Sequence, residues 1–484
     1  MTLSIKSKIL SSFFWVGIST FLSRASTILA TLILAGLLVP DDFGVVAVAN
    51  VITASLGLFR DLGMNQALIY QKEHIEEAAD TSMILSVSVS VILFLIGYFL
   101  AGPAALFFKN PAVKDVVQVL SFTLVISSFS SIPSSLLEKE MDFRKRALPE
   151  VASFFTYFAV SLILALNGFA YWSIVLGYTA LSIVNLIVVF IVSPWHPTLK
   201  LHRHMVSEMF GFGKYVMSNT VIVFILKNID DFSLGRIMGT VSLGFYSLAY
   251  RIANVPATQI THMVSKVVFP AMMQMSEDSQ RVKDFHLKTF YYLSIVNIPL
   301  AIGIICFAPP FFHIFYGTKW DAAIIPTQIL AIYGLTRGLF SSTTSVFMTL
   351  GRIREIFLFQ LCHLILLAVL IYPVITLYKI VGLSILLSLL NIANAVVIIM
   401  RMENFLGGVT VSSLKHLIYP SVISIIAIVV PFKAWTVLVG DLNVFSFFIL
   451  IGLSGLIYTI AVFKRDAELI DLIRNSLKGT IGNG

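Results

Sequence analysis

Long apolar runs separated by short polar turns are the dominant pattern of this chain. A helix rises about 1.5 Å per residue, so about twenty apolar residues cross the hydrocarbon core of a bilayer. The runs are continuous rather than alternating, which favours helices over the strands of a membrane barrel. The pattern predicts fourteen spans, at residues 9–38, 43–69, 81–102, 115–137, 150–168, 171–193, 213–235, 242–268, 287–308, 325–350, 356–377, 380–400, 416–438 and 443–463.

Two matches within the chain indicate an internal repeat. Residues of the first two spans recur 200 positions later, and a group of serines in span four recurs in span ten. Each copy therefore has six spans, and because six is even, both copies point the same way across the membrane. The matched residues are Leu34, Gly44, Ala49 and Ile52 with Leu234, Gly244, Ala249 and Ile252, and Ser130, Ser131 and Ser134 with Ser341, Ser342 and Ser345.

We therefore predict an all-α membrane protein made of two parallel six-helix repeats and two further helices. The expected parts are an N-terminal six-helix lobe at 1–205, a C-terminal six-helix lobe at 206–410, and two additional helices with a cytoplasmic tail at 411–484. The stretch 201–214, which is rich in His and Arg, joins the lobes either as an interfacial helix or as a solvated linker.

Composition and charge distribution exclude a soluble enzyme. Only 12% of the 484 residues are charged and 58% are hydrophobic, whereas a soluble domain carries about 25% charged residues. Twenty-one Lys and Arg residues fall on one side of the predicted spans and six on the other. Because Lys and Arg are enriched in cytoplasmic connections, we place both termini in the cytoplasm and the protein in the cytoplasmic (inner) membrane. Topology thus explains most of the net charge of +8, and we expect no nucleic-acid partner.

Several charged residues fall at membrane depth, where the free-energy cost of burying a charge must be offset. Inserting a basic residue at a helix centre costs about 2.5–3.5 kcal/mol, so four would cost roughly 10–14 kcal/mol if nothing offset it. A water-filled, positively charged cavity would offset this cost, and it would attract an anion such as a phosphate or diphosphate. The basic residues within or near the ends of spans are Arg24, Arg60, Lys227, Arg251, Lys266 and Arg337, and the acids are Asp61, Asp230 and Asp231.

Spacing suggests what some of these residues do. Lys227, Asp230 and Asp231 follow i, i+3, i+4 spacing, so they share one helix face. They form either a self-neutralising cluster or a site where an aspartate takes up a proton or a cation. Arg251 either pairs with one of these aspartates or presents its planar fork to a phosphate. Arg337 lies near the middle of span ten, which favours a cavity-lining role over snorkelling to the surface.

Sequence features give no reason to expect a bound cofactor. The pair Gly213-Lys214 is followed by Tyr215, so it does not complete a phosphate-binding loop, and no His/Cys metal spacing is present. Cys306 and Cys362 lie in apolar runs, which favours buried thiols over a disulfide. Without an ATP-binding domain, transport would use a gradient of H⁺ or Na⁺ or the concentration difference of the substrate.

Five motifs along the chain carry a family resemblance: LAGLLVPDDFGVVAVANVI, FRDLGMNQALI, NIDDFSLGRIMGTVSLGFYSLAYRIANVP, EKEMDFRKRALPE and IFYGTKWDAA. Their order and spacing resemble polysaccharide flippases of the Wzx type, from about residue 8 to residue 400. These belong to the multidrug/oligosaccharidyl-lipid/polysaccharide exporter superfamily. The resemblance implies fourteen helices with two six-helix lobes in a V shape. Related peptidoglycan-precursor flippases use cavity arginines, and Arg24 and Arg251 are the best matches here.

The resemblance implies a transporter that moves a polyprenyl-diphosphate-linked oligosaccharide from the cytoplasmic to the outer leaflet by alternating access, and not an enzyme. Asp230 or Asp231 would couple transport to an ion. Expected partners are the lipid-linked glycan and membrane lipid; we expect a monomer and leave open an interaction with a polysaccharide polymerase or export complex. The residues expected to bind the diphosphate are Arg24, Arg251, Lys227 and Arg337.

Two other functions are weighed against this one. A cation-coupled multidrug exporter of the same superfamily would need an acidic or aromatic cavity. The excess of basic over acidic residues at membrane depth disfavours this alternative. An integral-membrane glycan polymerase or ligase would need a large outer loop with catalytic acids or arginines. The longest outer connection runs only from Pro309 to Ile324, and the pair Asp41-Asp42 is expected to form a turn or a helix cap.

Overall fold

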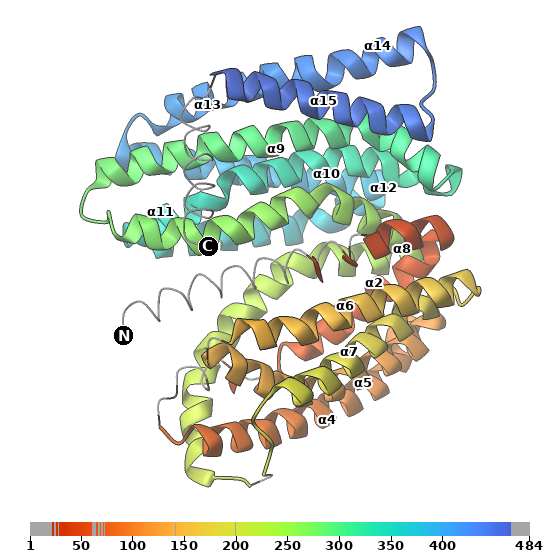
Figure 1. Ribbon diagram of the computed structural model, residues 1–484, viewed down its shortest axis with the longest axis vertical. Helices are drawn as coiled ribbons and strands as arrows, with labels where there is room; N and C mark the ends of the chain where they lie inside the picture. Colours follow the sequence, from red (N-terminus) through yellow and green to blue (C-terminus); the bar gives the residue numbers. More distant parts are fainter. Residues whose placement is uncertain are drawn as a thin grey trace. The chain divides into compact units, whose positions relative to one another are not determined.

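The computed structural model describes residues 22–23, 26–27, 29–60, 64–65, 68, 71, 73–140, 142–198 and 200–465, and for residues 143, 203–204, 207–223, 255–256, 259–267 and 353 it describes the backbone alone. Within this part of the chain all regular structure is helical (Figure 1). The helices are α2 (Pro40–Gly57), α4 (Ile75–Phe107), α5 (Ala112–Lys139), α6 (Phe143–Leu166), α7 (Trp172–Val192), α8 (Arg203–Met273), α9 (Ser279–Phe315), α10 (Asp321–Leu339), α11 (Thr343–Thr349), α12 (Ile353–Leu406), α13 (Val409–Ser424), α14 (Val430–Leu438) and α15 (Val444–Arg465). Short helical turns join some of them: η1 (Thr318–Trp320), η2 (Phe340–Ser342) and η3 (Ile425–Val429).

Two of these helices are too long to be single membrane spans. α12 has 54 residues, which corresponds to about 80 Å, against a hydrocarbon core of about 30 Å. Its helical geometry is broken at Lys379 (φ 56°, ψ −146°), and the 71 residues of α8 are broken in the same way at Gly239 (φ 82°, ψ 179°). These breaks lie between predicted spans eleven and twelve and between spans seven and eight, and they confirm both boundaries.

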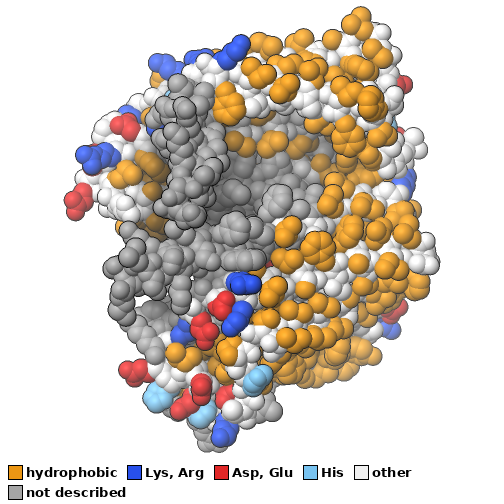
Figure 2. Space-filling model, viewed as in Figure 1, with side chains coloured by type: hydrophobic (Ala, Val, Ile, Leu, Met, Phe, Trp, Pro, Cys, Tyr) orange, Lys and Arg blue, Asp and Glu red, His pale blue; other side chains and the backbone are white. Residues whose placement is uncertain are grey.

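The surface of the described helices is suited to lipid. Nine helical segments in the described part of the chain are long and apolar enough to cross a membrane. Large apolar side chains stand on the outside, among them Phe99, Leu106 and Ile191 at 73%, 82% and 75% exposure. In Figure 2, hydrophobic side chains cover much of the right-hand part of the view. The chain is a multi-pass membrane protein; its first predicted span, 9–38, lies mostly outside the described residues, so the total of fourteen stays a prediction.

The second predicted span, 43–69, is interrupted by a turn, and the described residues 64, 65 and 68 beyond the turn are again helical. α2 ends at Gly57, and residues 58–60 form a turn in which the Arg60 N–H donates to the Gly57 carbonyl at 3.2 Å. Hydropathy does not report where a helix ends, because the apolar run continues through the turn. The turn brings Arg60 beside α5, where its Nη1 donates to the Ser127 hydroxyl at 2.8 Å.

The chain divides into two compact units, Met1–Ser247 and Leu248–Gly484. In the first unit α4 packs on α5, α6 packs on α7, and α5 also contacts α2 and α7 (Figure 1). In the second unit α9 packs on α10 and α13, and α10 packs on α12. The division falls inside α8, after the boundary at 205/206 that the repeat suggests. The bounds of the two lobes therefore stay a prediction.

Residues matched by the internal repeat occupy equivalent environments. Three of the four matched pairs are buried in both copies, and the fourth is partly buried in both. Matching burial at matched positions is what two copies of one structural unit would produce. The buried pairs are Leu34 with Leu234, Gly44 with Gly244 and Ala49 with Ala249, and the partly buried pair is Ile52 with Ile252.

The two repeated glycines lie in one helix–helix contact inside the first unit. A Cβ atom on Gly44 would stand 1.7 Å from the carbonyl oxygen of Thr240, and a Cβ on Gly244 would stand 1.8 Å from the carbonyl oxygen of Pro40. The contact is reciprocal, since Pro40 and Gly44 are related to Thr240 and Gly244 by the repeat. α2 and the second part of α8 can approach this closely only because neither glycine has a side chain.

In the acidic pair at the start of α2, Asp42 caps the helix, as predicted. Asp42 Oδ2 accepts a hydrogen bond from the Val39 N–H at 3.0 Å, and Asp42 Oδ1 accepts one from the Tyr171 N–H at 3.0 Å. Asp41 accepts a hydrogen bond from the Thr240 hydroxyl. Carboxylates at a helix N-terminus are stabilised by the unpaired N–H groups and by the helix dipole. Both acids thus have structural roles.

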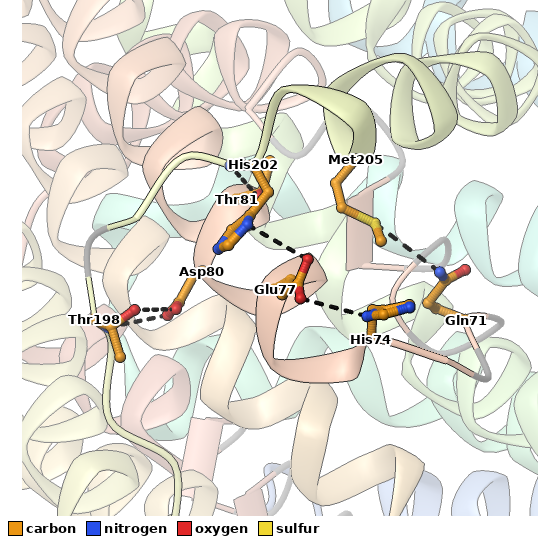
Figure 3. Close-up of polar contacts among 8 residues, drawn as sticks. All are labelled: Gln71, His74, Glu77, Asp80, Thr81, Thr198, His202 and Met205. Atoms are coloured by element: carbon orange, nitrogen blue, oxygen red, sulfur yellow. Dashed lines mark hydrogen bonds and ion pairs between the residues drawn. The ribbon is translucent and has the colours of Figure 1, made fainter.

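The chain between α7 and α8 is tied to the first turns of α4 (Figure 3). Asp80, which is buried, accepts hydrogen bonds from the backbone N–H of Thr198, at 3.0 Å, and from its hydroxyl. Thr81 Oγ1 accepts from the His202 N–H at 3.1 Å, and the Glu77 carboxylate lies 3.4 Å from Nδ1 of His202. These contacts fix the position at which α8 begins. The backbone is helical directly after them, as the interfacial-helix interpretation of 201–214 requires.

Replacing Asp80 by alanine is expected to lower the free energy of unfolding by about 3–6 kcal/mol, because two hydrogen bonds to a charged acceptor are lost. The matched control is Glu76→Ala on the same turn of α4, since Glu76 is exposed and its loss is expected to change stability by less than about 0.5 kcal/mol. Thermal unfolding of the purified proteins in one detergent measures both. Equal midpoints for the two variants would contradict this role of Asp80.

Candidate functional site

An arginine lies near the centre of the membrane-crossing segment Thr318–Thr349. Arg337 is within about 5 Å of the midpoint of this segment, measured along the helix axis. The nearer end of the segment, at Thr349, is about 18 Å away. The mid-span position predicted for Arg337 is therefore what the structure has.

Three neutral side chains surround the guanidinium of Arg337. Its Nη1 donates to the Tyr250 hydroxyl at 3.3 Å and to Asn254 Oδ1 at 3.2 Å. The guanidinium carbon lies 5.6 Å from the ring centre of Tyr333, where a cation is attracted by the aromatic face. Asn254 is buried, and its own amide N–H donates to the Tyr250 carbonyl at 3.1 Å, which directs its Oδ1 toward the arginine.

Two glycines allow α10 to bring this arginine so close to its neighbours. A Cβ on Gly334 would stand 2.6 Å from the carbonyl oxygen of Ala253 on α8, and a Cβ on Gly338 would stand 2.2 Å from Oδ1 of Asn297 on α9. Small residues four apart let membrane helices pack backbone to backbone. Arg337 lies between the two glycines, so the same close packing that builds the unit also positions the charge.

A third helix fixes the same stretch of α10 from another side. Asn391 on α12 donates through Nδ2 to the Thr336 hydroxyl at 2.6 Å and to the Tyr333 carbonyl at 3.3 Å. One turn earlier on α12, Ser388 donates to the Ile329 carbonyl at 3.0 Å. The stretch of α10 just before Arg337 is thus held by hydrogen bonds from α12, and the site is built on helices rather than on loops.

This arrangement is suited to bind an anion. Both of these hydrogen bonds leave from Nη1 rather than from the edge formed by Nε and Nη2. A guanidinium offers two parallel N–H donors along that edge, which match two oxygens of a phosphate. Within the described part of the chain no carboxylate lies at ion-pair distance from Arg337, so its charge is balanced only by neutral dipoles.

Arg251 lies on α8, in the same unit and next to a partner of Arg337. It directly follows Tyr250, and it is three residues before Asn254. Its side chain is partly buried. Its pairing with an aspartate of predicted span seven stays a prediction. Its role in binding a phosphate stays a prediction.

In the structure, the three charged residues predicted to share one face of span seven differ in burial and in their contacts. Lys227 is exposed and makes no ion pair with a described residue, so the cluster does not neutralise itself through this lysine. Asp230 is buried and accepts a hydrogen bond from the Tyr246 hydroxyl. The chain reverses at Gly239, and that reversal brings Tyr246 back to Asp230. Asp231 is partly buried.

Some predicted residues lie outside what the structure describes, and some residues of the site were not predicted. Arg24 and Asp61 are outside the described residues, as is the side chain of Lys266. The neighbours of Arg337 were missed as partners, although Tyr250 with Asn254 and Tyr333 with Arg337 both have the i, i+4 spacing that places side chains together on a helix. The spacing shows that the two side chains lie on the same face of a helix, but it does not show which other residues that face contacts.

The second unit also contains an apolar groove of about 750 Å³. Side chains of α9 and α15 form most of its walls, among them Pro299, Phe307, Phe447 and Ile451. Nearly all the groups that line it are hydrocarbon or aromatic, so water gains little there and an aliphatic chain would be favoured. The groove and the Arg337 site belong to the same unit.

Together these features define an all-helical, multi-pass membrane protein with a cationic site at the centre of a span. A protein-family model described as "Polysaccharide biosynthesis protein" matches residues 33–325, and the chain belongs to this family. It is 24% identical over 360 residues to "Lipopolysaccharide biosynthesis protein WzxC" of Escherichia coli K12, covering 74% of this chain and 73% of that protein. It is 26% identical over 354 residues to "Teichuronic acid biosynthesis protein TuaB" of Bacillus subtilis, with 72% and 73% covered. The resemblance to Wzx-type proteins is thereby confirmed.

Solved structures share the fold. "Lipid II flippase MurJ, inward closed conformation" superimposes with a TM-score of 0.71 at 16% sequence identity, over 94% of this chain and 99% of that chain. An inward-facing multidrug resistance transporter of the MATE family and the MOP superfamily gives a TM-score of 0.63 at 14% identity, over 84% and 98%. At such identities the likeness shows a common fold and no more.

Proposed function

We propose that this protein is a flippase that moves a polyprenyl-diphosphate-linked oligosaccharide from the cytoplasmic to the outer leaflet for the export of a cell-surface polysaccharide. It works by alternating access and is a transporter rather than an enzyme. The family to which the chain belongs supports the glycan pathway. A relative named "Succinoglycan biosynthesis transport protein ExoT", of Rhizobium meliloti, is 26% identical over 309 residues and supports a transport step.

One observation carries the proposal: the Arg337 guanidinium lies at the centre of a span among neutral partners. Such a charge is costly in a membrane unless it is hydrated or meets an anion. A diphosphate is the charged part of a lipid-linked glycan, and its oxygens match the fork of an arginine. The apolar groove along α9 and α15 suits the polyprenyl chain of the same molecule.

In this proposal fourteen spans form two six-helix lobes in a V shape, with both termini in the cytoplasm. Asp230 or Asp231 takes up the coupling H⁺ or Na⁺; burial and the Tyr246 hydroxyl favour Asp230 for this role. The protein acts as a monomer in the cytoplasmic membrane, without a bound cofactor, and passes its cargo toward polysaccharide polymerisation or export. The residues that bind the diphosphate are Arg24, Arg251, Lys227 and Arg337.

The alternatives require a different site. A multidrug exporter for organic cations would place carboxylates or unpaired aromatic faces at the centre of its spans, whereas the partners of Arg337 leave a net positive charge there. A glycan polymerase or ligase would need acids free for chemistry on the outside. In the acidic pair at the start of α2, which was the candidate for such acids, Asp42 caps the helix and Asp41 accepts a hydrogen bond from the Thr240 hydroxyl.

The proposal is tested by measuring transfer of a fluorescent polyprenyl-diphosphate oligosaccharide between the leaflets of proteoliposomes. Arg24→Ala and Arg251→Ala are each expected to lower the transfer rate by at least about 10- to 100-fold, because each removes charge-assisted hydrogen bonds worth about 1.5–3 kcal/mol. The matched control is Arg281→Ala at the start of α9, since Arg281 is 76% exposed and pairs with Asp278. Transfer near the wild-type rate in both test variants would exclude the diphosphate clamp.

A further inference from the structure

The first unit contains a polar cavity of about 420 Å³ that the proposed diphosphate site does not use. It lies where the end of α5 meets the turn after α2 and the first turn of α6. Five serines of α5 line it, together with Arg60, Asn65, Glu138 and Arg146, and every lining residue is polar or charged. Its size falls within the range of about 300–1,000 Å³ that is usual for small-molecule sites.

The serines present hydrogen-bond acceptors to this cavity. Each hydroxyl donates its proton to a carbonyl one turn earlier in α5: Ser130 to Ser127 at 2.9 Å, Ser134 to Ser130 at 2.7 Å, and Ser135 to Ser131 at 3.0 Å. A hydroxyl has one proton and two lone pairs, so what these serines still offer is lone pairs. A row of acceptors therefore runs along one face of α5.

Donors are supplied at two points by arginines. Nη1 of Arg60 donates to the Ser127 hydroxyl at 2.8 Å, and Nη1 of Arg146 lies 2.9 Å from the Glu138 carboxylate. Asn65 lines the same cavity, and its Oδ1 is buried without a hydrogen-bond partner among the described residues. A buried oxygen without a hydrogen-bond donor is costly, so rotation of the Asn65 amide toward a ligand with hydroxyl groups is favoured.

The second copy of the repeat keeps three of the five serines, but it shows that the fold does not require the other polar groups. When the serine match is extended along the helix, Ser127 corresponds to Gly338, Ser135 to Val346 and Glu138 to Thr349. Val346 is fully buried in an apolar cluster, and Gly338 packs against Asn297. The same helix therefore forms with small and apolar residues at these places. Ser127, Ser135 and Glu138 of the first unit therefore need another explanation, and a ligand supplies one.

We propose that this cavity is a sugar-binding subsite, which takes one pyranose ring of the glycan that the flippase transports. The inference rests on the proposed function and adds a second contact, remote from the diphosphate. Hydroxyls of a pyranose donate to the serine oxygens and to Glu138, and its oxygens accept from Arg60. A free inorganic anion fits poorly, because its oxygens would face a row of acceptors and a carboxylate. The basic turn after α5 places the cavity at the end of the unit that the Lys and Arg distribution assigns to the cytoplasm, where the cargo is loaded.

The test compares two probes on the full-length protein in lipid nanodiscs: a polyprenyl diphosphate that carries one hexose, and the same polyprenyl diphosphate without the sugar. Glucose, galactose and N-acetylglucosamine are each used as the hexose. The wild type is expected to bind at least one sugar-bearing probe about tenfold more tightly than the sugar-free one, since a site built to bond hydroxyls discriminates against a ligand that lacks them. The sugar-free affinity reports the diphosphate site alone.

Substitutions in the cavity test whether the preference for sugar-bearing probes arises there. Ser130→Ala with Ser134→Ala is expected to abolish it, and Asn65→Ala to reduce it, while the sugar-free affinity and the thermal midpoint stay at wild-type values. The matched control is the same change in the second copy, Ser341→Ala with Ser345→Ala, which should keep the preference. Equal wild-type affinity for both kinds of probe, or a preference that survives the cavity variants, overturns the subsite and leaves the flippase proposal standing. Failure of every probe to bind overturns both.

Discussion

Replacing Arg337 by methionine is expected to abolish flippase activity and to leave the protein folded in the membrane. Methionine fills a similar space without charge, so α10 keeps its packing against Ala253 and Asn297. What is lost is the Nε–Nη2 edge that can bind two phosphate oxygens. Two charge-assisted hydrogen bonds are worth about 3–6 kcal/mol together, so affinity for a polyprenyl diphosphate should fall by at least about 100-fold.

A conservative change separates the charge of Arg337 from its geometry. Arg337→Lys keeps one positive charge but loses the planar fork, and it is expected to recover only a small part of the affinity. Arg354→Met serves as the control, since Arg354 is exposed just beyond the end of the same span. Binding of the sugar-free polyprenyl diphosphate is measured for all three variants. If Arg337→Met binds it as tightly as the wild type, the arginine has a structural role only.

The second large effect is expected at the reciprocal glycine contact. Gly244→Ala would place a Cβ 1.8 Å from the carbonyl oxygen of Pro40, and Gly44→Ala would place one 1.7 Å from that of Thr240. Because the obstacle is backbone in each case, no side chain can move aside, and the two helices must separate. We expect each change to cost about 3 kcal/mol or more in folding free energy, seen as a loss of folded protein and a lower thermal midpoint.

The reciprocity of this contact gives a sharper test. One displacement of α2 from α8 relieves both clashes, so the double variant should cost clearly less than the sum of the two single variants. Gly102→Ala on α4 is the control, because no atom lies within 4 Å of the added Cβ, and alanine stabilises a helix interior relative to glycine by about 1 kcal/mol. Strict additivity of the two substitutions would show that Gly44 and Gly244 do not share a contact.

Hydropathy predicted much of the fold because the solvent demands it. A chain in lipid must satisfy its own backbone hydrogen bonds, so every long apolar run becomes a helix. The breaks at Gly239 and Lys379 fall where the pattern placed them. The end of α2 at Gly57 was missed, since the apolar run continues past it and local hydrogen bonding decides where a helix stops.

Residue chemistry predicted Arg337 as a site residue, because a charge at the centre of a span is visible in the sequence alone. Its partners were not predicted. Tyr250 and Asn254 lie more than 80 residues earlier and reach Arg337 only because Gly334 lets α10 approach α8. The cavity of the first unit escaped notice for a related reason: a row of serines is ordinary in a membrane helix until an arginine from another segment faces it.

By itself, then, the sequence determined that the chain lies in a lipid membrane, that its apolar runs are helical, that the chain contains a repeat, and that costly charges lie at membrane depth. All four follow from hydropathy, spacing and residue type, which are local properties. Only the tertiary structure decided that the repeated glycines meet one another, that Asp230 is bound by Tyr246 while Lys227 is exposed, and that Arg337 has neutral hydrogen-bond partners. These depend on how closely helices approach in space, and that distance is set by the packing of all their side chains together.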